Sequence, residues 1–208
     1  MCIRDSIGGI PLAIDTTAGE KERGTLEPLL AQPIKRSTLL YAKMTAISLF
    51  SGLSLLLLII LLYFIIPLIP FPEIRLDLKI HAFQYSMIFI ICIPIILFSS
   101  ALLTVVGSFT KTFKEAQTYL SLIIVLPTLP IIIAQLMNAD TSLLLMPIPS
   151  LAQSTLITDI IEEGKLNWGQ AAVSMVTTGL YAWLLARLAI FLYSLSLIHI
   201  SEPTRLRR

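Results

Sequence analysis

The chain has 208 residues, of which 56% are hydrophobic and 13% are charged, and its formal net charge is +2. A soluble domain carries about 25% charged residues, so this composition excludes an ordinary water-soluble fold. Disordered chains are poor in apolar residues, which excludes disorder as well. The near balance of basic and acidic residues argues against nucleic-acid binding, and two cysteines exclude a disulfide scaffold. We therefore expect a lipid bilayer to solvate much of the chain.

The two ends of the sequence can be translated from one short DNA element. One DNA spelling of residues 1–6, ATGTGTATAAGAGACAG, has a reverse complement that encodes residues 195–200. The element resembles a transposase adapter used in sequencing libraries, and such segments are set aside before fold reasoning. We expect residues 1–6 and 194–208 to derive from this adapter. Residues 7–193 are then expected to be an internal fragment of a longer protein.

Four uncharged runs are long enough to cross a membrane. They span 44–72, 82–110, 116–139 and 166–186, and each reaches the about 20 residues that a membrane helix needs. Backbone groups in lipid must bond within their own segment, so we expect four full transmembrane helices at 44–72, 82–110, 116–139 and 167–192. The short apolar run 7–14 indicates the end of a fifth helix. The expected fold class is an all-α polytopic membrane bundle.

The basic residues predict the orientation of this bundle. Segments 15–43 and 111–115 together hold seven lysines and arginines, whereas the loops expected on the opposite side hold three. The positive-inside rule then places 15–43 and 111–115 in the cytoplasm. In the outer segment 140–165, Pro147 and Pro149 interrupt any long helix. We expect short re-entrant or interfacial helices there, the last one ending near Gly164.

The cytoplasmic segment contains the densest cluster of charges in the chain. Glu20, Glu22 and Arg23 directly precede Gly24, a residue typical of the end of a helix. Taken alone, these charges are either a solvated surface or a surface that pairs with charges on a partner protein.

A new short helix is expected directly after this glycine. Thr25 is a suitable N-cap, and Glu27 in the first turn complements the positive helix end. Leu26, Leu29 and Leu30 stand at i, i+3 and i+4, so they make one apolar face. This face either enters the membrane interface or faces a soluble partner.

This pattern resembles the ABC-2 class of ABC transporter permeases and, within that class, the Nat-type sodium-efflux branch. The residues that carry the resemblance are Gly19-Glu20, Glu22-Arg23-Gly24-Thr25-Leu26-Glu27, Leu29-Leu30, Pro33, Arg36-Ser37 and Lys43. A second and weaker likeness to the family's outer segment lies at 146–150 and 159–164. The resemblance covers about residues 7–193.

The resemblance implies a permease unit of six membrane helices, of which this fragment would hold the end of the second and the last four. It implies that segment 19–33 couples the bundle to a separate ATP-hydrolysing subunit. Glu20, Glu22 and Arg23 would pair with charges on that ABC ATPase subunit, and the three leucines would fill a groove in it.

The resemblance also implies the rest of the transporter. A second permease subunit would complete a homodimer or a heterodimer in a bacterial or archaeal plasma membrane. The assembly would export sodium or another small substrate, and ATP would act only through the partner, so this chain is expected to bind no cofactor of its own.

Other chemistry finds little support in the sequence. No Gly-x-x-x-x-Gly-Lys-Ser/Thr motif occurs, so this chain is not expected to be an enzyme, and neither His-Glu-x-x-His nor Cys-x-x-Cys occurs as a metal motif. Arg187 either reaches the interface or contacts substrate. Small residues recur at helical spacing and indicate either close helix packing or a hydroxyl-lined path: Thr45, Ser48 and Gly52; Ser100, Thr104, Gly107 and Ser108; Ser174, Thr178 and Gly179. The alternative function is a non-transporting polytopic membrane protein, either an assembly factor or an intramembrane enzyme.

Overall fold

The computed structural model describes residues 9–25, 28, 35–68, 81–110, 112–136, 146–162, 164 and 166–200. All regular secondary structure in these ranges is helical. Within the described residues, three helices are long and apolar enough to cross a membrane, at Ser37–Ile65, Ala82–Phe109 and Trp168–Leu192. The expected all-α, multi-pass architecture is thus confirmed at this level.

The first helical rod consists of three joined pieces. The α-helix α2 (Ile10–Ile14) continues into a π-helical stretch, η2 (Asp15–Gly19), and then into α3 (Glu20–Glu22). A π-helix is a widened turn that is rare and often found at functional sites. Residues 10–14 of the short apolar run are therefore helical, as predicted. The helix does not end there but continues into the charged cluster.

The long helix α5 (Arg36–Ile65) begins well before the uncharged run that predicted it. Its N-cap is Lys35, so Ser37 lies in the first turn. A short 3-10 turn, η3 (Ile66–Leu68), follows it. The helix contains Lys43 because this cation finds partners inside the protein, as described below.

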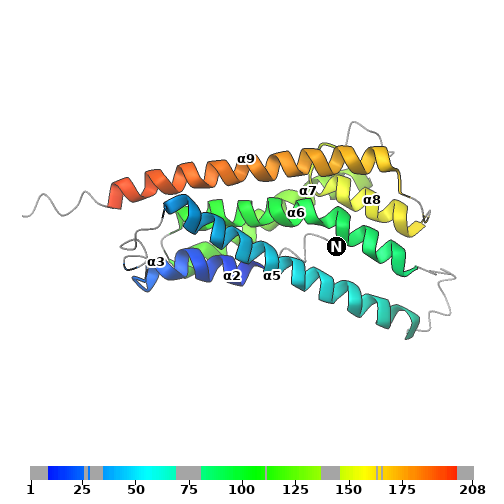
Figure 1. Ribbon diagram of the computed structural model, residues 1–208, viewed down its shortest axis with the longest axis horizontal. Coiled ribbons are helices and arrows are strands. Elements are labelled where there is room, and N and C mark those ends of the chain that lie inside the picture. Colours follow the sequence, from blue (N-terminus) through cyan, green and yellow to red (C-terminus); the bar gives the residue numbers. More distant parts are fainter. Residues whose placement is uncertain are drawn as a thin grey trace, which may run out of the picture.

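Helix α6 (Ala82–Phe109) lies at the centre of the bundle. It packs against α5 on one side and α9 (Trp168–Ile200) on the other, as Figure 1 shows. About half of the apolar stretch of α6 that could cross the membrane is buried in the protein. The corresponding share is 17% in α5 and 17% in α9. Many large apolar side chains of α5 and α9 are exposed, as expected for surfaces that face lipid.

Helix α7 (Phe113–Leu136) corresponds to the third predicted run and contains Pro127 and Pro130. Its crossing of the bilayer stays a prediction. The short helix α8 (Leu151–Glu162) follows, between Ser150 and Gly164, which both have positive φ values of about 69° and 68°. Figure 1 places α8 and α3 at opposite ends of the bundle.

A small apolar core holds the first rod against the bundle. It joins α2 and η2 to α5, α6 and α7 through side chains that are almost fully buried: Ala13, Ile14, Ala18, Ile47, Leu103, Ala116 and Leu120. Gly107 of α6 lies so close to Thr17 that an added Cβ would be 2.2 Å from the Thr17 Oγ1. This packing fixes where the charged residues after Gly19 meet the other helices.

Candidate functional site

The first contact of the charged segment joins α3 to α5. The Lys43 Nζ pairs with the Glu20 Oε2 and also donates to the carbonyl of Thr16, which lies in the π-helical turn. The Lys43 side chain is only 8% exposed and that of Glu20 is 27% exposed. A buried lysine is stable only when it is paired, and this one has a carboxylate and a carbonyl.

The second contact joins α3 to the C-terminal end of α6. The Lys21 Nζ donates to the carbonyl of Ser108 and, at 3.2 Å, to that of Thr110. The last carbonyls of a helix lack partners within the helix and carry its negative end, so a lysine there is favourable. Burial lowers the pKa of Lys21, and the nearby Lys43 lowers it further, whereas Glu115 acts in the opposite direction.

The third contact joins α3 to the N-terminal end of α7. The Glu22 Oε2 accepts a hydrogen bond of 2.6 Å from the backbone N–H of Phe113, the first residue of α7. The Thr112 Oγ1 accepts another from the N–H of Glu115, at 3.2 Å. A carboxylate at the N-terminus of a helix satisfies a free donor and complements the positive end.

The next residues end the helical rod. Gly24 has a φ of +70°, and its N–H donates to the carbonyl of Lys21 while the N–H of Thr25 donates to that of Glu20. This pair of bonds is the Schellman ending of a helix, which favours glycine at the left-handed position. Glycine was predicted to break the helix here, and that prediction is confirmed. The Thr25 hydroxyl also bonds back to Glu20, at 3.3 Å.

Arg23 differs from the three residues before it, because its ion pair within the described residues stays in its own rod. It pairs at 3.0 Å with Asp15, in the same rod, and both side chains are more than half exposed. A solvent-facing pocket of about 420 Å³ lies beside it, lined by Gly19, Glu22, Arg23 and Phe113. The other predicted coupling residues, Leu26, Glu27, Leu29 and Leu30, lie outside the described residues.

A second polar cluster lies at the other end of the bundle and was not predicted. Gln153 of α8 is fully buried and donates to the hydroxyls of Ser174 and Thr178 on α9, at 3.3 and 3.2 Å, while it accepts from the N–H of Ser150. Gln84 of α6 donates to the carbonyl of Ile160, also in α8. The signal in the sequence was a glutamine on the apolar face of a short helix.

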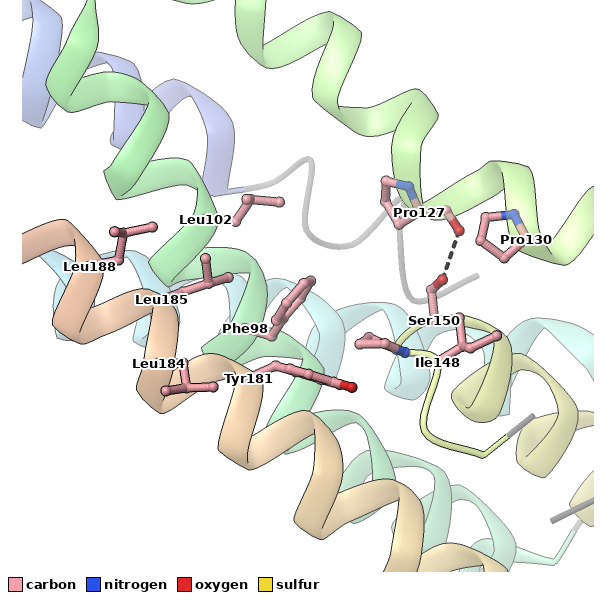
Figure 2. Close-up of a pocket in the computed structure, with 11 residues that line it drawn as sticks. Phe98, Leu102, Pro127, Pro130, Ile148, Ser150, Tyr181, Leu184, Leu185 and Leu188 are labelled. Carbon is pink, nitrogen blue, oxygen red and sulfur yellow. Dashed lines mark hydrogen bonds between the residues drawn. The ribbon is translucent and has the colours of Figure 1, made fainter. Parts of the chain in front are cut away.

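An apolar cavity of about 630 Å³ lies beside this cluster, between α6, α7, α9 and the turn before α8 (Figure 2). The Ser150 hydroxyl donates at 2.7 Å to the carbonyl of Pro127, next to the point where Pro130 lacks an N–H. The residues that line the cavity carry no charge. Hard cations require several oxygen ligands, so this cavity is unsuited to a bare sodium ion.

The sequence leaves two roles open for Arg187, which either reaches the membrane interface or contacts substrate. Its guanidinium lies 4.9 Å from the centre of the Trp183 ring, one turn earlier on α9. Such a cation–π contact is typical of an arginine near a membrane interface, where tryptophan is also enriched.

Comparisons with known proteins decide the family. Residues 6–197 match the family described as "ABC-2 family transporter protein". The chain belongs to the ABC-2 family of transporter proteins. It is also similar to the ABC transporter permease protein NatB of Bacillus subtilis (strain 168), with 32% identity over 127 residues, or 59% of this chain and 32% of the relative. This ABC-2 family chain thus matches about a third of the relative's length, and no solved structure matches it significantly.

Proposed function

We propose that the chain is the membrane-spanning permease part of an ATP-driven ABC exporter. The observation that carries the proposal is the family match over 6–197, together with a similar protein whose name is that of an ABC transporter permease. In this proposal the ATP-hydrolysing subunit is a separate chain, and ATP acts only there. A second permease subunit, the same or different, completes the transporter in a bacterial or archaeal plasma membrane.

The docking surface for the ATPase is the charged segment and the chain that follows it, residues 19–33. Its described part lies at one end of the bundle, where Arg23 is exposed beside a pocket of about 420 Å³. A surface that receives force must be accessible to the partner and also attached to the helices. The segment meets both needs, because Glu20, Lys21 and Glu22 bond to three other helices.

The substrate in this proposal is sodium or another small molecule. Sodium export is supported by the sequence's likeness to the Nat-type branch. The described membrane spans contain no aspartate or glutamate, so a sodium path through them would have to use hydroxyl and carbonyl oxygens. The second subunit and the rest of the protein are the other sources of ligands.

Co-purification and transport test this function. The intact gene is expressed with the ATPase gene beside it, the complex is reconstituted into liposomes, and ATP-dependent movement of ²²Na⁺ is measured. The control is an ATPase in which the lysine of the ATP-binding loop is replaced. We expect a stable complex whose ion flux requires ATP. Failure of the permease to bind any ATPase would contradict the permease role, whereas ATP hydrolysis without sodium flux would contradict only sodium as substrate.

A further inference from the structure

We propose that Glu20, Lys21 and Glu22 transmit movement of the docking segment to the membrane helices, with one helix assigned to each residue. Glu20 holds α5 through Lys43, Lys21 holds the end of α6, and Glu22 holds the start of α7. This inference rests on the proposed function and narrows its docking surface. Glu20, Lys21 and Glu22 bond to the membrane helices, and Arg23 with the chain up to residue 33 is left to bind the ATPase.

The helical geometry explains how three consecutive residues reach three helices. Successive side chains of an α-helix point about 100° apart, so three in a row fan out over more than half of the circumference. Helix α3 ends among the ends of its neighbours, and each side chain therefore meets a different one. Two of the partners are backbone groups at the ends of α6 and α7, and the third, Lys43, lies about two turns into α5.

The charges match the ends that they contact. Lys21 carries a positive charge to the negative C-terminal end of α6, and Glu22 carries a negative charge to the positive N-terminal end of α7. Helices α6 and α7 run in succession, with only 110–112 between them. The short rod thus contacts both α6 and α7 at the junction between them, and its charges stabilise the dipoles of both helices.

The three contacts differ in how easily they can be changed. Lys43 is buried and Lys21 is partly buried, so replacing either disturbs the fold. Glu22 is exposed, and its bond within the described residues is to a backbone N–H, so its side chain can be removed with little damage. Lys114 is the matched control, because it is a charged and exposed residue of α7 next to Phe113 and lies outside the docking segment 19–33.

The test compares Glu22→Ala, Glu22→Gln and Lys114→Gln in the intact transporter with its ATPase. Spin labels at two exposed positions, Thr38 on α5 and Thr118 on α7, report the distance between these helices without ATP and with ATP and vanadate. Co-purification and ATP hydrolysis are measured on the same samples, and thermal unfolding checks that each variant is folded.

We expect the wild type and Lys114→Gln to show the same nucleotide-dependent change in distance. Glu22→Ala should lose that change while it still binds the ATPase and hydrolyses ATP within about threefold of the wild-type rate. Glu22→Gln keeps the acceptor oxygen and should restore the change. A normal change in Glu22→Ala, or an equal loss in Lys114→Gln, overturns the inference. A wild-type chain that binds no ATPase contradicts the proposed function instead.

Discussion

Gly107→Ala tests the close approach of α6 to the first rod. A Cβ at this position would lie 2.2 Å from the Thr17 Oγ1, 2.9 Å from its Cβ and 3.2 Å from its Cγ2. Rotation about χ1 of Thr17 moves Oγ1 and Cγ2 but leaves its Cβ in place and too close. The hydroxyl is also bonded to the carbonyl of Ala13. The two helices must therefore separate.

The size of the effect follows from a control glycine. A Cβ at Gly52 or Gly179 would meet nothing within 4 Å, so alanine there brings only its better helix propensity. Alanine at position 107 brings the same gain. The difference in the free energy of unfolding between Gly107→Ala and Gly52→Ala is then the overpacking cost alone. Overpacking of a close contact costs about 1–3 kcal/mol, so Gly107→Ala should be less stable than Gly52→Ala by that amount.

The assay is equilibrium unfolding in mixed micelles with increasing dodecyl sulfate, followed by circular dichroism. The double variant Thr17→Gly/Gly107→Ala removes all three clashing atoms and should recover most of the overpacking cost in a double-mutant cycle. Equal free energies of unfolding for Gly107→Ala and Gly52→Ala would refute the close approach.

Three further predictions use the same assay. Lys43→Met leaves the partly buried Glu20 unpaired and should lower the free energy of unfolding by about 3 kcal/mol. The control Lys35→Met, at an exposed position, should change it by less than about 0.5 kcal/mol. Similar losses in the two variants would contradict the pairing of Lys43 with Glu20. Gln153→Leu removes three buried bonds and should cost about 2 kcal/mol, given about 0.6 kcal/mol for one such bond in a membrane, and a stabilised variant would refute this. The pKa of Lys21 in the folded chain lies below its ordinary value of 10.5, so between these two pH values the unfolded chain binds more protons than the folded chain. The free energy of unfolding of the wild type should therefore rise with pH in this range, and Lys21→Gln should lack that rise.

Local signals in the sequence predicted most of the helices. Uncharged runs locate the three spans because lipid tolerates few charges, and Gly24 and Gly164 mark helix ends because each adopts a positive φ. The uncharged run 44–72 predicts only part of α5, whereas Ser37, as a possible N-cap, indicates a helix start close to the observed one at Arg36. The run begins after Lys43, but a charged residue can lie within a membrane-spanning helix when a carboxylate from elsewhere reaches it.

The candidate site could be located from the sequence but its bonds could not. Glu20 and Glu22 were predicted to pair with a partner protein, and that stays a prediction. The structure adds that Glu22 bonds to an N–H that is 91 residues away in sequence, which no local pattern reveals. Lys21 was not among the predicted site residues because a lysine in a charged cluster looks solvated until the helix end beside it is known.

The π-helical turn Asp15–Gly19 sets the direction in which the side chains of α3 point. Each hydrogen bond of a π-helix spans one more residue than that of an α-helix, so Glu20, Lys21 and Glu22 leave this turn at a fixed angle relative to α2. Removing one residue from this turn would rotate all three side chains by about 100° and point each toward the wrong helix end. The number of residues in this turn is therefore as tightly constrained as the identity of the charges after it.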